Sequence, residues 1–592
     1  MLQTTITKRP RNINLSRAAA LLYGDLGTSK AYVIGLAFAA VGYASFWLII
    51  AVCCLLILIG LNYVLVCKYY PNGGGVYAST CERSEVVALI GSFFLIVDYL
   101  VTAAISALSA FIYFGVDDPV LCAMAAILLI GCINYFGPKL AGRVAVVIGY
   151  ATVATFLLLT VVSVPHLAEG FRNLKPLTGG VIKNWEAFVG VIVALSGIET
   201  IANITGIMRL NRPLHPNQPR VTHISTPAIL LVIFQVAAFT TIFSLAISSI
   251  QGFQLEGGTV EAANGIEVRD SMLRYLGETL GSRLFGGFVG QIFGFVLGGV
   301  IGMLLLSAVN TAIVGLSSLQ YVMASDGMIP RFFQRLNRYG VPLFPLLIAT
   351  VIPMLIIATI HNIARLADLY AIGFVGAIAT NLGAMATNFK LDLRLKERVF
   401  LFFSALIMFV IEISLFIEKS HARTFLVTTI LIGMILRALT KEYKENKEEA
   451  VEGLLVSTDQ DAIFCAVQHE GRALDYAIER ATRLKRPLHV LFVKEQEVIT
   501  RRDLKRMAQD DPEANQLQKS LKKRLSRNLL HFHYTVSDAP ANTIAEYAIK
   551  LQVPQLIVGL PRGRGVQQLF SRNLLRDLMK ILPENLLLLV IG

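Results

Sequence analysis

The first 440 or so residues alternate between long apolar runs and short polar loops. Each run approaches the roughly 20 mostly apolar residues that a helix needs to cross a membrane. The pattern predicts about twelve spans, with one further apolar stretch at 305–325 that is either another span or an amphipathic helix. The expected spans are residues 15–40, 44–67, 86–114, 118–136, 141–164, 187–208, 226–251, 285–306, 342–360, 364–388, 399–418 and 422–439.

The pattern changes near Lys441, where the charged run KEYKENKEEA leads into a mixed polar and apolar sequence. Alternating strands and helices in that region predict a parallel sheet with helices on both faces. The expected organisation is a transmembrane domain at 1–440, a charged linker at 441–452 and an α/β domain at 453–592. The five expected strands lie at 453–458, 487–495, 531–538, 554–562 and 584–592.

Composition supports this division and narrows the classes of function. Hydrophobic residues make up 55% of the 592 and charged residues 16%, whereas a soluble chain usually carries about 25% charged residues. The seven cysteines form no CxxC motif and no Cys/His cluster, which argues against a disulfide framework or a zinc site. The sequence contains no recognisable nucleophile–base pair, so we do not expect an enzyme.

Basic residues gather in the loops of one side of the expected bundle. The N-terminal segment and the loops 137–144, 209–220, 331–338 and 390–398 are basic, while the opposite loop 256–278 is acidic. The positive-inside rule then predicts a cytoplasmic N-terminus, and an even number of spans leaves the C-terminal domain cytoplasmic too. The net charge of +13 is therefore interpreted as basic loops at a cell membrane, with no nucleic-acid partner and no cleavable signal peptide.

The first expected span is interrupted by residues that disfavour a continuous helix. Gly24 and Gly27 bracket Asp25, and the hydroxyl residues Thr28 and Ser29 follow. A helical glycine costs about 1 kcal/mol, and a carboxylate at mid-membrane costs at least about 2.5–3.5 kcal/mol. Unwound backbone at this depth is tolerated where it lines a cavity, so the pattern predicts a broken helix. The alternative is a packing kink in which Asp25 is a structural ion-pair partner.

The sixth expected span has a similar interruption. Ser196, Gly197, Glu199 and Thr200 lie in the middle of an otherwise apolar run. Interrupted helices five spans apart suit a five-plus-five inverted repeat, in which broken helices at corresponding positions mark the substrate site.

The third expected span carries a polar stripe. Asp98, Thr102 and Ser106 are spaced by four and share one helix face, and Tyr99 flanks that face. An acid inside the membrane is a functional-site hypothesis by default. The two hydroxyl residues alone would also suit the packing of small residues between helices.

Asp25, Asp98 and Glu199 are candidates for a single cavity. Lys30 lies close to the first break, and no other Lys or Arg falls near mid-span to neutralise these acids. Carboxylates, hydroxyls and free carbonyls are hard oxygen ligands, so the site suits a small alkali cation. Neighbouring acids disfavour one another's ionisation, which allows one of them, such as Glu199, to hold a proton at neutral pH.

These motifs resemble a known transporter family. The stretch GDLGTS from Gly24, followed by Tyr32, resembles the GD-x-GTS…Y signature of Kup-type potassium uptake transporters. The interrupted SGIE segment and the stretch NTAIVGLSSLQYVMASDGMIP resemble the amino acid–polyamine–organocation superfamily. The spacing of Asp98, Tyr99, Thr102 and Ser106 is most similar to that of the Kim subgroup of high-affinity potassium importers.

The resemblance implies a LeuT-like fold, K⁺/H⁺ symport and a homodimer that pairs through the cytoplasmic domains. It places the main potassium site at Asp25, with Tyr32 and Ser196, and it makes Glu199 the proton-coupling residue. Ser196 departs from the threonine usual in the subgroup but keeps the hydroxyl. The predicted potassium-binding set, from residue chemistry and resemblance together, is Asp25, Thr28, Tyr32, Asp98, Tyr99, Thr102, Ser106, Ser196 and Tyr370.

The segment IVGLPRGRGVQQLFSRNLL resembles the phosphate loop of universal stress protein domains, although only Gly559 matches its ATP-binding pattern. Backbone amides of a Gly-rich turn at a helix N-terminus suit a phosphate. The resemblance leaves open ATP, cyclic di-AMP as in the Kim subgroup, or a scaffolding domain without a ligand. The candidate nucleotide-binding residues are Gly559, Arg562, Gly563, Arg564, Gly565 and Arg572.

Three functions remain open at this point. The first is a potassium importer, which requires no cofactor. The second is an amino acid or amine permease of the same superfamily; the acid Asp25 in the first break disfavours a substrate carboxylate but suits a cationic amine. The third is a membrane sensor that binds its ligand without transporting it.

Overall fold

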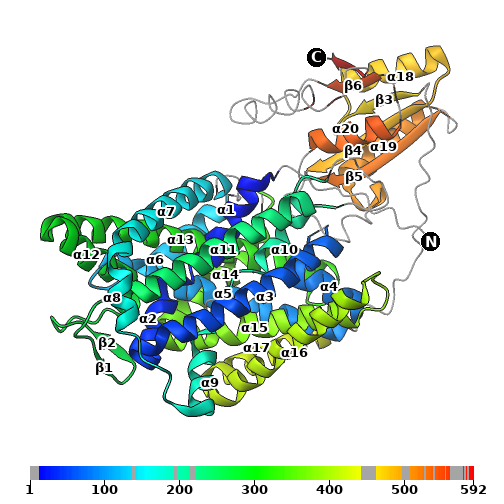
Figure 1. The fold of residues 1–592 in the computed structure, drawn as a ribbon. Helices are drawn as coiled ribbons and strands as arrows, with labels where there is room; N and C mark the ends of the chain where they lie inside the picture. The colour runs from blue at the N-terminus through cyan, green and yellow to red at the C-terminus, as the bar shows by residue number, and fades with distance from the viewer. Residues whose placement is uncertain are drawn as a thin grey trace. The chain divides into compact units, whose positions relative to one another are not determined.

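The structure is a computed structural model. It describes residues 13–71, 73–136, 141–192, 196–211, 220–337, 339–441, 462–495, 507–525, 529–537, 540–551, 553, 555–559, 578, 582 and 586–591. The chain divides into two compact units, a helical one that reaches Leu439 and a second one that contains the C-terminal region (Figure 1).

Every expected span has a helical counterpart. The first comprises two helices, α1 (Leu15–Leu26) and α2 (Lys30–Val41), and the sixth comprises α9 (Gly180–Gly190) and α10 (Thr200–Ile204). The uninterrupted helices are α3 (Ser45–Tyr69), α5 (Glu85–Phe114), α6 (Pro119–Asn134), α7 (Ala141–Ser163), α11 (Thr222–Ile247), α13 (Gly287–Ser325), α14 (Leu343–Thr359), α15 (Ile363–Thr387), α16 (Leu395–Glu418) and α17 (Ser420–Lys441).

Length and composition support a membrane location for this bundle. In the described residues, 8 helical stretches are long and apolar enough to cross a membrane, and α6 and α14 are shorter apolar helices. The stretch 305–325 belongs to α13, which runs without a break for 39 residues. It is therefore neither a separate span nor a separate amphipathic helix, because nothing in its sequence ends the helix before Ser325.

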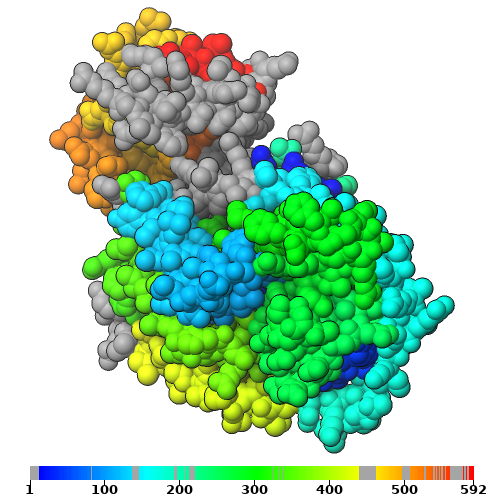
Figure 2. All heavy atoms as spheres, turned by 90° about the vertical axis from the view of Figure 1, so that its left-hand side faces the viewer, coloured from blue at the N-terminus to red at the C-terminus, as the bar shows by residue number. Residues whose placement is uncertain are grey.

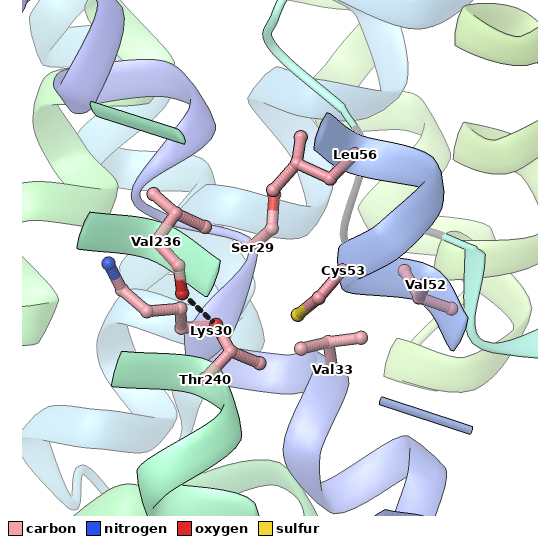
Figure 3. Close-up of a pocket in the computed structure, with 8 residues that line it drawn as sticks. All are labelled: Ser29, Lys30, Val33, Val52, Cys53, Leu56, Val236 and Thr240. Carbon is pink, nitrogen blue, oxygen red and sulfur yellow. Dashed lines mark hydrogen bonds between the residues drawn. The ribbon is translucent and has the colours of Figure 1, made fainter. Parts of the chain in front are cut away.

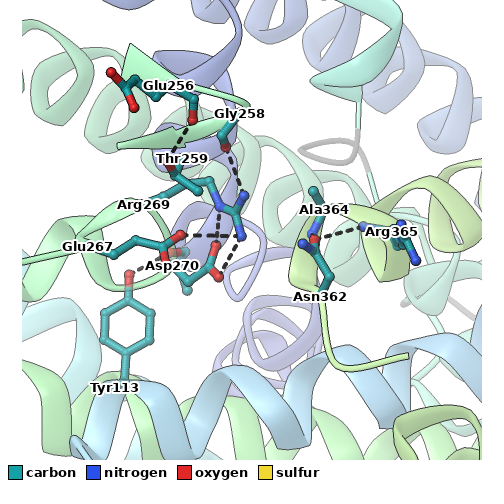
Figure 4. Close-up of polar contacts among 11 residues, drawn as sticks. Tyr113, Glu256, Gly258, Thr259, Glu267, Arg269, Asp270, Asn362, Ala364 and Arg365 are labelled. Atoms are coloured by element: carbon teal, nitrogen blue, oxygen red, sulfur yellow. Dashed lines mark hydrogen bonds and ion pairs between the residues drawn. The ribbon is translucent and has the colours of Figure 1, made fainter. Parts of the chain in front are cut away.

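The ends of the helices follow from local capping. The side chain of Ser84 accepts a hydrogen bond from the backbone of Val86 at the start of α5, and α5 ends at Gly115 with a φ of +75°. Asn362 accepts hydrogen bonds from the backbone amides of Ala364 and Arg365 at the start of α15 (Figure 4). Such caps satisfy amides that have no partner within the helix.

The helices α5 and α15 form the buried centre of the unit. A Cβ atom added to Gly373 of α15 would lie 2.7 Å from the backbone nitrogen of Asp98 on α5, so the two helices pack at backbone distance. α16 covers the other side of α15, and α6 packs against α14. Figure 2 shows one face of the helical unit, where the light-blue residues of α6 lie beside the yellow-green residues that follow α13.

Several shorter elements were not expected from the apolar pattern. They are α4 (Gly75–Arg83), α8 (Leu167–Arg172), α12 (Met272–Phe285) and a hairpin of β1 (Gln254–Glu256) with β2 (Thr259–Glu261). Arg269 joins the hairpin to the segment that follows it, because its guanidinium contacts Asp270 at 2.7 Å and the carbonyl of Gly258 at 2.8 Å (Figure 4).

The C-terminal unit contains the expected parallel sheet. Its strands are β3 (Ile463–Ala466), β4 (Leu488–Glu495), β5 (Leu530–Ser537), β6 (Gln555–Gly559) and β7 (Leu587–Ile591), in the spatial order β5-β4-β3-β6-β7. The strand expected at 453–458 lies outside the described residues, and β3 at Ile463–Ala466 was not expected.

Helices cover both faces of this sheet. α18 (Arg472–Leu484) and α19 (Pro512–Arg524) pack on the face that carries Val490 and Phe492. α20 (Pro540–Lys550) packs on the face that carries Leu491 and Val493. Successive residues of β4 thus serve opposite cores, as the two-residue period of a strand requires.

Candidate ion-binding site

The first break is a turn between α1 and α2. Gly27, Thr28 and Ser29 separate the two helices. The hydroxyl of Thr28 donates to the carbonyl of Asp25 at 2.6 Å, and the Thr28 amide approaches the same carbonyl at 3.1 Å. These local hydrogen bonds replace the helical ones, so the backbone leaves the helix without losing its partners.

The two breaks touch each other at backbone distance. Gly197 has a φ of +91°, which favours glycine, and it lies in the turn between α9 and α10. A Cβ atom there would lie 2.7 Å from the backbone nitrogen of Leu26 and 2.9 Å from the carbonyl carbon of Asp25. Position 197 therefore admits no side chain.

Side chains of the two breaks also bond across this contact. Thr200 donates from its hydroxyl to Oδ2 of Asp25, and the Oγ atoms of Ser29 and Ser196 are 2.9 Å apart. Asp25 is only 5% exposed. The expected unwinding at both positions is confirmed, and the structure brings Asp25, Ser196 and the sixth-helix acid Glu199 together.

The third-helix stripe lies in the same buried region. Asp98 of α5 is within electrostatic range of Asp25 and Glu199. Among the described residues, its Oδ1 has no hydrogen-bond partner, and neither has the hydroxyl of Ser106, two turns further along. Thr102 donates to the carbonyl of Asp98 at 2.7 Å, which leaves its oxygen lone pairs available to another group.

Tyr99 is held between two other helices. Its hydroxyl oxygen accepts from the amide nitrogen of Asn203, just past the sixth-helix break, at 2.9 Å. A Cβ atom on Gly315 of α13 would lie 3.0 Å from the Tyr99 ring. Tyr99 thus flanks the site and connects it to α10 and α13.

Two further predicted tyrosines are fully buried in the same region. The hydroxyl of Tyr32 on α2 has no hydrogen-bond partner in the part of the chain that the structure describes. Tyr370 on α15 lies within electrostatic range of Tyr32 and of the acids Asp25, Asp98 and Glu199. The contact of the two breaks therefore lies near Asp98 and Tyr370, while Thr102 and Ser106 lie further along α5.

The three acids are not paired with a base in the described part of the chain. Within the described ranges, no Lys or Arg forms an ion pair with Asp25, Asp98 or Glu199. Lys30 is buried next to the first break, but its amine contacts Tyr23 rather than an acid. Figure 3 shows the Lys30 side chain extending away from the cavity that its stem helps to line.

The arrangement offers hard oxygen ligands to a cation. In the described part of the chain, no three His, Cys, Asp or Glu side chains lie close enough to form a metal centre. What converges is mixed: hydroxyls, unwound backbone and carboxylates, the ligand types that suit alkali cations in broken-helix transporters. Among the described side chains of this region, the buried oxygens without a partner include Tyr32 Oη, Asp98 Oδ1, Ser106 Oγ and Glu199 Oε2.

Sequence reasoning missed three contributors to this region. Thr200 was seen in the break but not as the partner of Asp25, and Asn203 was not considered. Lys30 was expected near the break, but its complete burial was not. A hydroxyl one residue after an intramembrane acid is the only sequence signal that pointed to Thr200.

The predicted nucleotide residues are mostly outside the structure's described residues. Gly559 ends β6, where an added Cβ atom would lie 3.5 Å from the Cβ of Ala473 on α18. Arg562, Gly563, Arg564, Gly565 and Arg572 lie outside the described residues, so their arrangement stays a prediction.

Fold and site together define a polytopic secondary transporter, and a family model described as amino acid permease matches residues 13–436. The chain belongs to this family; it is a multi-pass membrane transporter and not an enzyme. The potassium transporter KimA of Bacillus subtilis (strain 168) is 24% identical over 518 residues, which cover 81% of this chain and 80% of that protein.

Two solved structures of the Eremococcus coleocola manganese transporter are also similar. One is of a mutant, and the other is a complex with an aromatic bis-isothiourea substituted compound. Both have a TM-score of 0.48, with 13% and 14% sequence identity, and cover 72% of this chain and 93% of the other.

Proposed function

We propose that this protein imports potassium across the cell membrane by symport with protons. The observation that carries the proposal is the set of buried, unpartnered oxygens around the joined breaks of the first and sixth helices. Buried oxygens without partners are costly, and a cation that binds several of them at once would stabilise the site. The distant relation to KimA, a potassium transporter, supports potassium as that cation.

The residues take distinct roles in this proposal. Asp25 supplies the negative charge that draws K⁺ into the break, and Tyr32 and Ser196 supply neutral oxygens beside it. Thr28 and Tyr370 complete the surroundings of this ion. Glu199, one residue from the hydroxyl that contacts Asp25, exchanges the coupled proton, because burial next to another acid favours its protonated form.

The third helix lines the path beyond the main site. Asp98 and Ser106 offer oxygens without partners, and Thr102 offers lone pairs. Tyr99 stands at the edge of this path, where it contacts Asn203. These residues bind a second ion or guide the first one.

A second candidate function comes from the family description, which names amino acid permeases. Permeases that hold a substrate carboxylate need free amides at a break. Here the break places Asp25 against Thr200, so a carboxylate would meet another carboxylate. Among the substrates of such permeases, only a cationic amine suits this arrangement.

The test is rescue of a potassium-uptake-deficient bacterium on low-potassium medium. The wild-type chain is compared with D25N, its matched control, at equal expression. Growth with the wild-type chain and none with D25N is the expected result. Uptake of a labelled cationic amine without potassium uptake would favour the permease. Potassium binding without flux would favour the sensor.

We also propose that the C-terminal domain responds to an adenine nucleotide and pairs two chains. In domain order its strands are arranged 3-2-1-4-5, and ligands of such sheets bind outside the carboxyl ends of the strands where the order reverses. Gly559 ends β6 at that point, beside β3. Arg562, Arg564 and Arg572 follow in the sequence and would hold the phosphates.

Calorimetry of the purified full chain with ATP, AMP and cyclic di-AMP tests this proposal, with R562A/R564A as the matched variant. Binding that the double substitution removes is the expected result. If no nucleotide binds and transport is unaltered by deletion of 453–592, the domain is only an assembly module.

A further inference from the structure

A second buried tyrosine stands near Tyr99 and the acids. Tyr63 of α3 is 0% exposed and lies within electrostatic range of Asp98 and Glu199. Tyr99 lies within electrostatic range of the same two acids and of Tyr63 itself. The two phenol groups are therefore neighbours, although one belongs to α3 and the other to α5.

Each of these hydroxyls accepts a hydrogen bond from an asparagine amide. Nδ2 of Asn381 on α15 lies 3.3 Å from Oη of Tyr63, and Nδ2 of Asn203 on α10 lies 2.9 Å from Oη of Tyr99. Because the phenol oxygen is the acceptor in both bonds, its own proton remains available to a further oxygen. We call Tyr63 with Asn381, and Tyr99 with Asn203, the two Asn–Tyr pairs.

The short helix α4 supports both asparagines. Oγ of Ser79 donates to Oδ1 of Asn381 at 2.6 Å, which directs the amide nitrogen toward Tyr63. At the start of α4, Gly75 has a φ of +43°, and a Cβ atom there would collide with Oδ1 of Asn203. This close approach requires a glycine. One element thus sets the position of both amides.

Both pairs lie toward the ends of their helices that the basic loops mark as cytoplasmic. Asn381 is less than two turns from the end of α15, which leads into the basic loop 390–398. Asn203 follows the sixth-helix break and precedes the basic loop 209–220, and Tyr63 is less than two turns from the end of α3. An ion that leaves the acids toward this surface would meet the two pairs.

The pairs join helices that carry different parts of the site. One pair connects α3 to α15, and the other connects α5 to α10. A hydrogen bond that is present in one conformation and absent in another favours the first, so both bonds stabilise the arrangement in which these helices are together. If the helices separate, the phenol oxygens lose their amides and can face a cation, because neutral oxygens replace the hydration shell of K⁺.

We propose that Asn203 and Asn381 are positioning residues that hold the Tyr99 and Tyr63 hydroxyls across the cytoplasmic exit of the ion site. The exit is closed while both hydrogen bonds are made. When the helices separate, the bonds break and the released phenol oxygens line the way out, which makes Tyr63 a further residue of the ion path. This inference rests on the proposed function as a potassium transporter.

Cys67 is a native reporter of this exit. It lies one turn closer to the end of α3 than Tyr63, is 0% exposed and is within electrostatic range of Tyr63. A chain that keeps Cys67 and has alanine in place of every other cysteine is treated, in inside-out vesicles, with a membrane-impermeant thiosulfonate. A companion chain that keeps only Cys53, a buried cysteine nearer the other end of α3, reports any general loosening.

The variants remove one hydrogen bond each. N203L and N381L replace an amide by an apolar group of similar volume, and Y63F removes only the accepting oxygen. N62L is the matched control, because Asn62 is the neighbour of Tyr63 and is also 0% exposed. Its amide donates at 2.8 Å to Ser404 of α16 instead of a tyrosine near the acids.

N203L, N381L and Y63F should each raise the labelling rate of Cys67 about threefold to tenfold, the range for loss of one neutral hydrogen bond, while N62L leaves it unchanged. Y63F and N381L together should raise it no more than either alone, because both remove the same bond. Unchanged labelling in the three variants, an equal increase in N62L, or an equal increase at Cys53 would overturn the proposal. If one variant fails to fold, the other two still decide.

Potassium uptake by whole cells that express the same chains separates this proposal from the proposed function. The labelling does not depend on which ion is transported. The expected labelling pattern without potassium uptake would refute the proposed substrate and leave the role of the two Asn–Tyr pairs intact. Potassium uptake with unchanged labelling in all variants would refute the role of the pairs alone.

Discussion

Replacement of Asp25 by asparagine is the most direct test of the ion site. Asparagine keeps the shape of the side chain and an oxygen that can accept the hydrogen bond of Thr200. Only the negative charge is removed. The substitution therefore separates the electrostatic role of Asp25 from its role in joining the two breaks.

The expected loss of binding is large. At a separation of about 4 Å and an effective dielectric constant of about 20, the attraction between two unit charges is about 4 kcal/mol. Because each 1.4 kcal/mol is a factor of ten in affinity, K⁺ should bind about a thousandfold more weakly to D25N. Uptake at low external potassium should then be abolished.

The effect on stability should have the opposite sign. A carboxylate at the centre of a membrane costs at least about 2.5–3.5 kcal/mol, and asparagine avoids most of this penalty. The melting temperature of D25N should therefore be equal to or higher than that of the wild type. This combination distinguishes a ligand from a structural acid, whose loss would lower both stability and activity.

The assay is potassium uptake in proteoliposomes together with thermal unfolding of the same preparations. T200V is the matched control, because it keeps the charge and removes one hydrogen bond to it, worth about 1.5–3 kcal/mol. Its affinity should fall by about one to two factors of ten. Wild-type affinity in D25N would refute the assignment of Asp25 to the site.

Three further outcomes test other residues. T102V should weaken the apparent potassium affinity about tenfold while V101T changes it less, and labelling of a single cysteine at position 102 by lipid-phase reagents only would contradict the path. E199Q should flatten the pH dependence of uptake and keep potassium binding; an unchanged pH profile would make Glu199 a structural acid. Burial, with smaller contributions from His489 and His531, lowers the pKa of His533 in the C-terminal domain to about 4. Because the unfolded value is about 6.5, that domain should lose up to roughly 3 kcal/mol of stability as pH falls from about 6.5 to about 4, and H533N should unfold with a weaker pH dependence in urea titrations.

Much of the membrane fold could be predicted from residue patterns alone. Apolar length locates a span because the bilayer sets it, and the clustering of Gly24, Asp25 and Gly27 marks a break because each residue separately disfavours a helix there. The same reasoning predicts that the third-helix acid Asp98 faces the site, because a charge inside a membrane must face the interior of the helix bundle.

Other features depend on contacts that local patterns do not contain. The amine of Lys30 could have turned toward Asp25, but the packing of α7 and α11 places it beside the rings of Phe156 and Phe239. The close approach of Gly197 to Leu26 depends on two segments far apart in the chain. Short elements such as β3, with four residues, and α4, with nine, are too short to show a clear period in the sequence.

The length of α13 has a mechanical consequence. Its 39 residues extend for about 58 Å at 1.5 Å per residue, nearly twice the hydrocarbon thickness of about 30 Å. In a straight helix of this length, a tilt of about 10° would displace one end by about 10 Å relative to the other. Gly315, which faces the Tyr99 ring, lies toward the C-terminal end of this helix. A small tilt of α13 would therefore move Gly315 sideways and change its contact with the Tyr99 ring.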